Sequence, residues 1–339
     1  MNGVDFKLGT IEEGARNAVL QCMGVKKGEH VYIVSDKQTL AVGSALKEQA
    51  EKIVGADNVK IAFLEDFSGR PLKSLPKEIN STIPWADVTF WAAQSLAGEL
   101  PTRQQFLEKA KMYARHGHMP NIDTRLMEQG MCADYNEVFD VTRKIFNAVR
   151  KVSKIRVKND LGLELSIEFD KSWRWVPSDG RFLSKGRWGN LPDGEVFTAP
   201  KNVNGTIITN LLGDSFSAKY GNFKDSLTLQ VSDSRIELES IKCQNKSIQE
   251  EIAFYLSTEE NSKRASEFAL PTNPLLMKLP TIGNLLQDEK ARVHIAFGDP
   301  YQEETGASWK SSTHVDMLLE SCDLWIDGDV VMRNGAYTV

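Results

Sequence analysis

Two histidines and one aspartate have a spacing that suits a metal site. His294 lies in the segment RVHIAFG, and His314 lies two residues before Asp316 in the segment STHVD. Imidazole and carboxylate groups are common ligands of transition metals. Side chains at positions i and i+2 share one face of a strand but not of a helix, so His314 and Asp316 can reach one ion only from extended backbone. The chain has few other imidazoles, since its five histidines are at positions 30, 116, 118, 294 and 314.

The residues around His294 predict a strand with one apolar and one functional face. Apolar side chains at 293, 295 and 297 alternate with His294, Ala296 and Gly298, which is the period of a strand. A single histidine on such a strand is usually a core residue satisfied by one hydrogen bond, but the nearby His-x-Asp pair favours a metal. The metal stays open, because imidazole suits zinc, iron, cobalt and nickel, and two histidines with one carboxylate also form the facial triad of non-haem iron oxygenases.

A second histidine pair is predicted to lie outside the metal site. His116 and His118 precede Met119 and Pro120 in a segment with loop character and with no carboxylate in register. We expect both imidazoles to be structural or to face solvent.

Composition excludes several classes of protein. The 339 residues are 41% hydrophobic, enough for a large core and about two domains. The net charge of -5 argues against a nucleic-acid partner, which requires a basic face. No apolar run reaches the length of a membrane span, and the first residues lack the pattern of a signal peptide, so we expect a cytoplasmic protein. The four cysteines form no C-x-x-C pair, so free thiols are expected.

The elements that must position the site belong to the α/β class. Strands and helices alternate over residues 1–150, which predicts an N-terminal doubly wound parallel sheet domain without a G-x-G nucleotide motif. Residues 151–339 have many short alternating runs and predict a β-rich α+β domain that binds the metal. A helix is expected over residues 247–268 and a hairpin turn at Asp327-Gly328.

Three further segments place carboxylates near this site. They are NLPDGEVFTAP at 190–200, ASEFALPTNP at 265–274, where Glu267 is expected at a helix-to-loop transition, and LLQDEK at 285–290. Each segment alone is an ordinary strand opening or helix end. Together, and followed by HIAFG and HVD, they resemble the M29 metallopeptidases of the aminopeptidase T and aminopeptidase S type. The resemblance is dense over residues 180–330 and is one of architecture over the first half.

The resemblance implies a function and a ligand set. It implies a metallo-aminopeptidase, active as a homodimer, that removes N-terminal residues from small peptides with water activated by two divalent ions, zinc, cobalt, manganese or magnesium. Four carboxylates would balance the four positive charges of two such ions. Glu267 and Tyr301 are the candidate catalytic residues, and Asp288 is an alternative to Glu289. The site residues carried over by position are Glu195, Glu267, Glu289, His294, Tyr301, His314 and Asp316.

Two other functions are compatible with the same residues. Bacterial dihydroxypyridine ring-cleaving dioxygenases resemble this fold, and His294, His314 and Asp316 could hold a single Fe(II) as in those enzymes. A non-catalytic, metal-dependent assembly protein is the third hypothesis. The presence of both Glu195 and Glu267 favours two metals and hydrolysis, because a single-iron site does not require four carboxylates.

Overall fold

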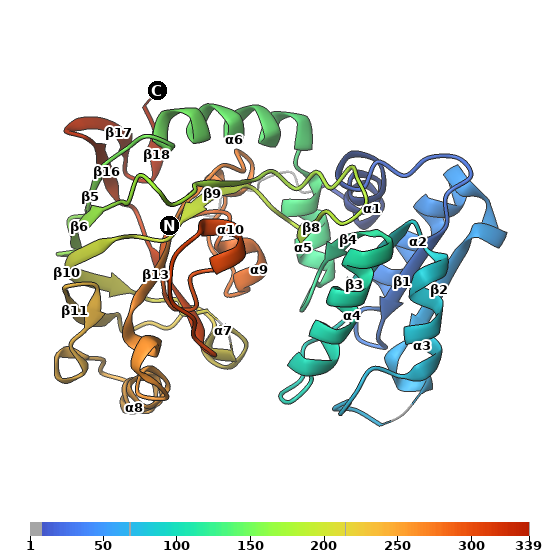
Figure 1. Ribbon diagram of the computed structural model, residues 1–339, viewed down its shortest axis with the longest axis horizontal. Helices are drawn as coiled ribbons and strands as arrows, with labels where there is room; N and C mark the ends of the chain where they lie inside the picture. The colour runs from blue at the N-terminus through green and yellow to red at the C-terminus, as the bar shows by residue number, and fades with distance from the viewer. Residues whose placement is uncertain (1–8, 68, 214, 339) are drawn as a thin grey trace. The chain divides into compact units, whose positions relative to one another are not determined.

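The computed structural model describes residues 9–67, 69–213 and 215–338, which form two compact units (Figure 1). The first unit comprises Met1–Phe139, Asp179–Gly194 and Asn273–Leu276. The second comprises Asp140–Ser178, Glu195–Thr272 and Met277–Val339. None of the helices in the described ranges is long and apolar enough to cross a membrane.

The first unit is built on a parallel sheet, as the alternation of elements predicted. Its strand order is β2-β1-β3-β4-β8 and every neighbouring pair is parallel, which is the arrangement of a doubly wound fold. Strands β1 and β3 are buried along their whole length, so apolar residues face both sides of the sheet. The strands are β1 (Val31–Ser35), β2 (Val59–Phe63), β3 (Val88–Ala92), β4 (Arg115–His118) and β8 (Trp188–Asn190).

Helix α1 (Ile11–Asn17) precedes the first strand, and further helices follow in the connections after β1, β2, β3 and β4. Helix α1 begins at a capping box, in which the Thr10 hydroxyl accepts the Glu13 N–H and the Glu13 carboxylate accepts the Thr10 N–H, and these bonds satisfy donors that the helix leaves free. The helices of this unit are α1 (Ile11–Asn17), α2 (Leu40–Val54), α3 (Lys77–Thr82), α4 (Leu100–Tyr113) and α5 (Thr124–Glu128). Helix α6 (Tyr135–Val149) includes residues of both units.

The expectation of a loop around His116 and His118 is wrong. Both lie on β4 and are buried. The Thr89 hydroxyl lies 2.9 Å from His116 Nδ1, and His116 Nε2 lies 3.1 Å from His118 Nδ1. The four residues of β4 contain no apolar side chain that could reveal a strand by its period. Their polar groups are satisfied by partners such as Thr89 for His116 and Glu29 for Arg115.

The buried His116 predicts a loss of stability in acid. Burial lowers the pKa of His116 from 6.5 to about 3, so between these values the unfolded chain binds a proton that the folded protein does not. The free energy of unfolding should therefore fall as the pH drops below about 6.5, by up to about 1.4 kcal/mol per pH unit for this group. A His116→Asn variant should lose less stability between about pH 7 and about pH 5 in urea unfolding. Equal losses in the variant, the wild type and a His30→Asn control would contradict this origin.

The second unit consists of two antiparallel sheets around one hydrophobic core. Sheet B has eight strands in the order β12-β11-β10-β6-β5-β16-β17-β18, and sheet C has five in the order β15-β14-β13-β9-β7. Sheet C contributes Phe268, Ile295 and Met317 to the core, and sheet B contributes Leu165 and Ile207. This confirms the predicted β-rich α+β texture of the second half.

Most strands of this unit are short, as the short alternating runs over residues 151–339 predicted. Sheet B contains β5 (Lys154–Lys158), β6 (Glu164–Glu168), β10 (Asn202–Thr209), β11 (Leu227–Ser232), β12 (Arg235–Ile236), β16 (Asp323–Ile326), β17 (Asp329–Arg333) and β18 (Ala336–Tyr337). Sheet C contains β7 (Val176–Ser178), β9 (Glu195–Thr198), β13 (Ala265–Pro271), β14 (Val293–Gly298) and β15 (His314–Leu319). The helices are α7 (Ser215–Tyr220), α8 (Lys246–Leu256), α9 (Leu285–Asp288) and α10 (Gln302–Thr305). The hairpin turn predicted at Asp327-Gly328 lies between β16 and β17.

The expected helix over 247–268 is too long, and this changes the setting of Glu267. Helix α8 ends at Leu256, and β13 begins at Ala265 and pairs with β14 and β9. All seven residues of β13 are buried. A strand covered on both faces lacks the alternation that distinguishes it from a helix, so Glu267 lies on a strand rather than at a helix end.

Candidate metal centre

The candidate ligands share one face of sheet C. Along β9, β13, β14 and β15, apolar residues such as Val196, Phe268 and Ile295 face the core, and the alternate positions face the other way. The register places Glu267 opposite Ala296, which is in turn opposite Asp316. The small alanine leaves room for the two carboxylates. The side chains on this second face include Glu195, Glu267, His294, His314 and Asp316.

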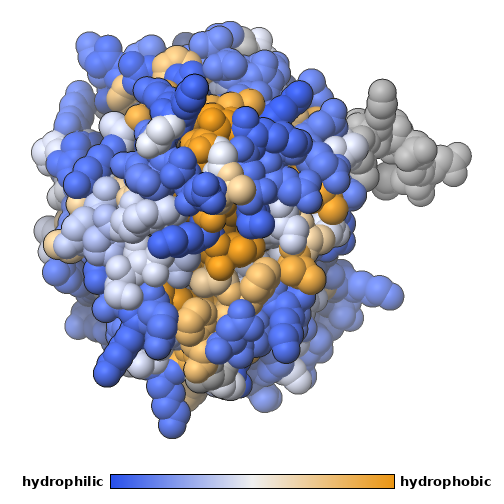
Figure 2. All heavy atoms as spheres, turned by 90° about the vertical axis from the view of Figure 1, so that its right-hand side faces the viewer, coloured by the Kyte–Doolittle hydropathy of each residue, from blue (hydrophilic) through white to orange (hydrophobic). Residues whose placement is uncertain are grey.

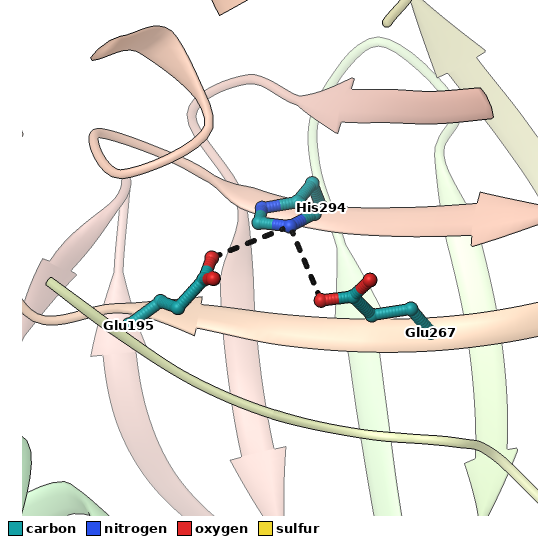
Figure 3. A group of neighbouring side chains, drawn as sticks. All are labelled: Glu195, Glu267 and His294. Carbon is teal, nitrogen blue, oxygen red and sulfur yellow. Dashed lines mark ion pairs between the residues drawn. The ribbon is translucent and has the colours of Figure 1, made fainter. Parts of the chain in front are cut away.

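These side chains form two groups with one shared member. Ligand atoms of Glu195, Glu267 and His294 lie within 4.8 Å of one another, and so do those of Glu267, His314 and Asp316. Figure 3 shows the first group, in which both glutamates point toward His294. The Glu267 Oε1 atom lies 3.9 Å from His294 Nε2, and its Oε2 atom lies 3.4 Å from His314 Nε2. Glu267 therefore offers one oxygen to each group.

Backbone carbonyls orient both imidazoles. The Nδ1 atom of His294 lies 3.3 Å from the carbonyl oxygen of Arg292, and that of His314 lies 2.9 Å from the carbonyl oxygen of Asp299. A carbonyl can only accept, so each Nδ1 carries a proton, and Nε2 is the nitrogen that faces the carboxylates and could bind an ion. The Tyr255 hydroxyl also fixes the His314 backbone, since it accepts the N–H at 3.1 Å and donates to the carbonyl at 3.2 Å.

The electrostatics of this face favour a bound cation. Burial lowers the pKa of His294, but the surrounding carboxylates, Glu195 first among them, outweigh burial and raise it. Asp316 raises the pKa of His314 in the same way, and burial raises the pKa of Glu195 to about 8 despite nearby positive charges. The raised pKa values of the two histidines indicate an excess of negative charge around them.

The two groups fit divalent metal ions. Glu195 is buried, and its Oε2 atom has no hydrogen-bond partner among the described residues although it lies 3.6 Å from His294 Nε2. A buried carboxylate oxygen without a partner is costly unless a cation satisfies it. Two ligands about 2.1 Å from one ion at a tetrahedral angle lie roughly 3.4 Å apart, close to the separations measured here. Carboxylate and imidazole together suit zinc, cobalt and manganese.

The adjacent acids Asp288 and Glu289 have different surroundings. The Asp288 carboxylate accepts the backbone N–H groups of Ile282, Gly283 and Asn284, so it stabilises the turn before α9. Glu289 belongs to neither group of candidate ligands, and its Oε1 atom lies 2.8 Å from Lys290 Nζ. Of the two acids, Glu289 is therefore the one whose carboxylate lies beside the candidate metal centre, through its contact with Lys290.

Tyr301 lies at the edge of the site. Its ring centroid is 4.8 Å from that of His314 and 5.9 Å from that of Phe197. The backbone of Tyr301 is left-handed, with φ 50°, a conformation that costs a non-glycine residue energy and is common at functional sites. The residue is 40% exposed, so Tyr301 forms part of the accessible rim.

The sequence did not reveal one charged residue of the candidate metal centre, Lys290. Lys290 lies 2.5 Å from Glu195 Oε1 and is 3% exposed. Its segment has the sequence of a surface helix end, yet residues 286–290 are all buried. The role of Lys290 follows only from its ion pair with Glu195, which lies 95 positions earlier in the sequence. No local sequence pattern indicates this pairing.

Two curated relatives match part of this chain. Aminopeptidase T of Thermus thermophilus is 28% identical over 176 residues, which are 44% of this chain and 40% of the relative. Aminopeptidase T of Thermus aquaticus gives the same values. The matched segment thus spans less than half of either relative.

Two solved structures share the fold. Wild-type AmpT from Thermus thermophilus has a TM-score of 0.72 at 18% identity and covers 97% of this chain and 99% of that one. The 2,5-dihydroxypyridine dioxygenase from Pseudomonas putida KT2440 has a TM-score of 0.70 at 15% identity and covers 97% of both chains. At these identities the two structures support the fold alone.

The sequence model of one family covers nearly all of both units. That family is described as thermophilic metalloprotease (M29), and its model matches residues 29–337. The match includes every candidate ligand on sheet C, and the earlier resemblance is confirmed. The chain belongs to the M29 family of metallopeptidases.

Proposed function

We propose that this protein is a metal-dependent aminopeptidase that hydrolyses N-terminal residues from small peptides at a two-metal site. The observation that carries this proposal is the shared carboxylate of Glu267, with one oxygen toward each of two ligand groups. Glu195 and His294 would complete one position, and His314 and Asp316 the other. Membership in the M29 family supports metal-dependent peptide hydrolysis.

The residues of the site would each have a different role in hydrolysis. Divalent ions held there, whether zinc, cobalt, manganese or magnesium, would lower the pKa of a bound water and polarise the scissile carbonyl. Glu267 lies between the two positions, and we propose that its carboxylate also accepts the proton of the attacking water and passes it to the leaving amine. Tyr301 on the exposed rim would donate a hydrogen bond to the oxyanion. Glu289 would contribute negative charge that balances the ions.

The test is hydrolysis measured together with metal content. Purified protein, loaded with zinc, cobalt or manganese in turn, is assayed against a panel of N-terminal amino-acid amides, and elemental analysis counts the metal. We expect about two ions per chain and release of ammonia. One iron per chain, with oxygen uptake on dihydroxypyridines and no amide cleaved, would instead support the single-iron dioxygenase.

The homodimer expected from the family resemblance is part of this proposal. The face shown in Figure 2 is mostly hydrophilic, with a band of hydrophobic side chains through its middle. Exposed apolar surface of this kind is often covered by a partner. Light scattering that gives the mass of one chain at micromolar concentration would contradict a dimer.

A further inference from the structure

Lys290 places a positive charge inside the candidate metal centre. It follows α9 and precedes β14, and its Nζ atom lies 2.5 Å from Glu195 Oε1 and 2.8 Å from Glu289 Oε1. The side chain is 3% exposed. An ammonium group so far from solvent requires carboxylate partners, and two of the candidate acids provide them.

The same contacts leave one oxygen of Glu195 available. Its Oε1 atom accepts a hydrogen bond from Lys290, whereas its Oε2 atom faces His294 and has no hydrogen-bond partner in the described ranges of the chain. An ion that binds both oxygens of Glu195 requires the ammonium to leave. An ion that binds Oε2 alone shares a carboxylate with a like charge and is repelled in a buried site where screening is weak.

The second group of ligands has its own close contacts between imidazole and carboxylate. His314 and Asp316 lie 3.4 Å apart, and the Glu267 oxygen that faces them is 3.4 Å from His314. The ammonium of Lys290 forms its ion pair with Glu195, a ligand of the first position. The ammonium therefore repels an ion at the first position more strongly than an ion at the second position.

On the basis of the proposed two-metal function, we infer that the Lys290 ammonium is the counter-ion of the metal-free site. It would compete with the ion that Glu195, Glu267 and His294 would hold. The two ions therefore bind with unequal affinity, first beside His314 and Asp316 and then beside Glu195. In the metal-free protein the ammonium balances carboxylates that would otherwise repel one another on one buried face. Loading of the second ion displaces the ammonium from Glu195.

Cobalt titration of the metal-free protein, by calorimetry and by equilibrium dialysis with elemental analysis, tests this inference without an activity assay. The wild type should bind two Co²⁺ ions in two separated steps. In Lys290→Met the weaker step should tighten by about ten-fold or more, because the competing charge is gone. Lys290→Arg, which keeps the charge, and Lys310→Met, which removes an exposed charge, should titrate like the wild type.

The outcomes separate this inference from the proposed function. An unchanged or weaker second step in Lys290→Met, with two ions still bound by the wild type, would overturn the competition and leave the two-metal site intact. A wild type that binds no more than one ion would overturn both. If metal-free Lys290→Met does not stay folded, the variant is prepared with Co²⁺ and its release to a chelator is followed. Slower loss of one of the two ions supports the inference, and equal or faster loss overturns it.

Discussion

Replacing Glu267 with glutamine is expected to lower amide hydrolysis by more than about 100-fold and to reduce bound metal, because the shared ligand of both positions is lost. Glu267 is buried and contributes one oxygen to each ligand group. Glutamine has the same shape but offers one neutral oxygen in place of a carboxylate. The fold should survive, since the core residues Phe268 and Leu270 on the other face of β13 are untouched. Hydrolysis rate, elemental analysis and circular dichroism measure the three effects.

A matched control separates the site from the general effect of removing a glutamate. Glu164 lies on β6 of sheet B, where its exposed carboxylate pairs with Arg156 and Lys158. Glu164→Gln should retain wild-type activity and metal content. Undiminished turnover in Glu267→Gln would remove this residue from the site, and an equal loss in both variants would show that the effect is not local.

Replacing Gly298 with alanine is expected to destabilise the second unit by more than about 3 kcal/mol and to disorganise the metal centre. Gly298 has φ +119°, and an added Cβ would lie 2.1 Å from the Thr313 carbonyl oxygen. That oxygen cannot move freely, because it accepts the Asp299 N–H at 2.8 Å. Gly298 is also the register partner of His314. Urea unfolding and metal binding measure the two effects.

Gly328 provides the control for backbone strain alone. Its φ is +106°, but an added Cβ would meet no atom within 4 Å, and the residue lies in the turn between β16 and β17. Gly328→Ala should cost about 1–3 kcal/mol and leave metal binding unchanged. Equal destabilisation in the two alanine variants would show that the contact with Thr313 contributes nothing.

The strands that carry the ligands could be predicted where large apolar side chains alternate with polar or small ones. His294 alternates with apolar neighbours on β14, and the His-x-Asp spacing of His314 requires the extended backbone found in β15. The setting of Glu267 could not be predicted, because Ser266 and Glu267 are adjacent on β13 and the strand shows no polar-apolar alternation. The same reason applies to His116 on β4, whose neighbours give no apolar pattern.

The composition of the charged cluster depends on pairings between distant segments. Glu195 and Lys290 are 95 residues apart in sequence, and only the pairing of β9 with β13 and of β13 with β14 brings their segments together. Local sequence suggested an exposed helix end at Lys290. The choice between Asp288 and Glu289 likewise depends on the turn at 282–284, whose backbone N–H groups take the Asp288 carboxylate.

Anomalous X-ray diffraction from crystals grown with zinc would test the two-metal site most directly, because it locates each ion relative to its ligands. We expect two anomalous peaks on the face of sheet C that carries the candidate ligands. One should lie among Glu195, Glu267 and His294 and the other among Glu267, His314 and Asp316, with the Glu267 carboxylate between them. A single peak bound by the two histidines and Asp316, with Glu195 still paired to Lys290, would contradict the two-metal site and the aminopeptidase mechanism built on it.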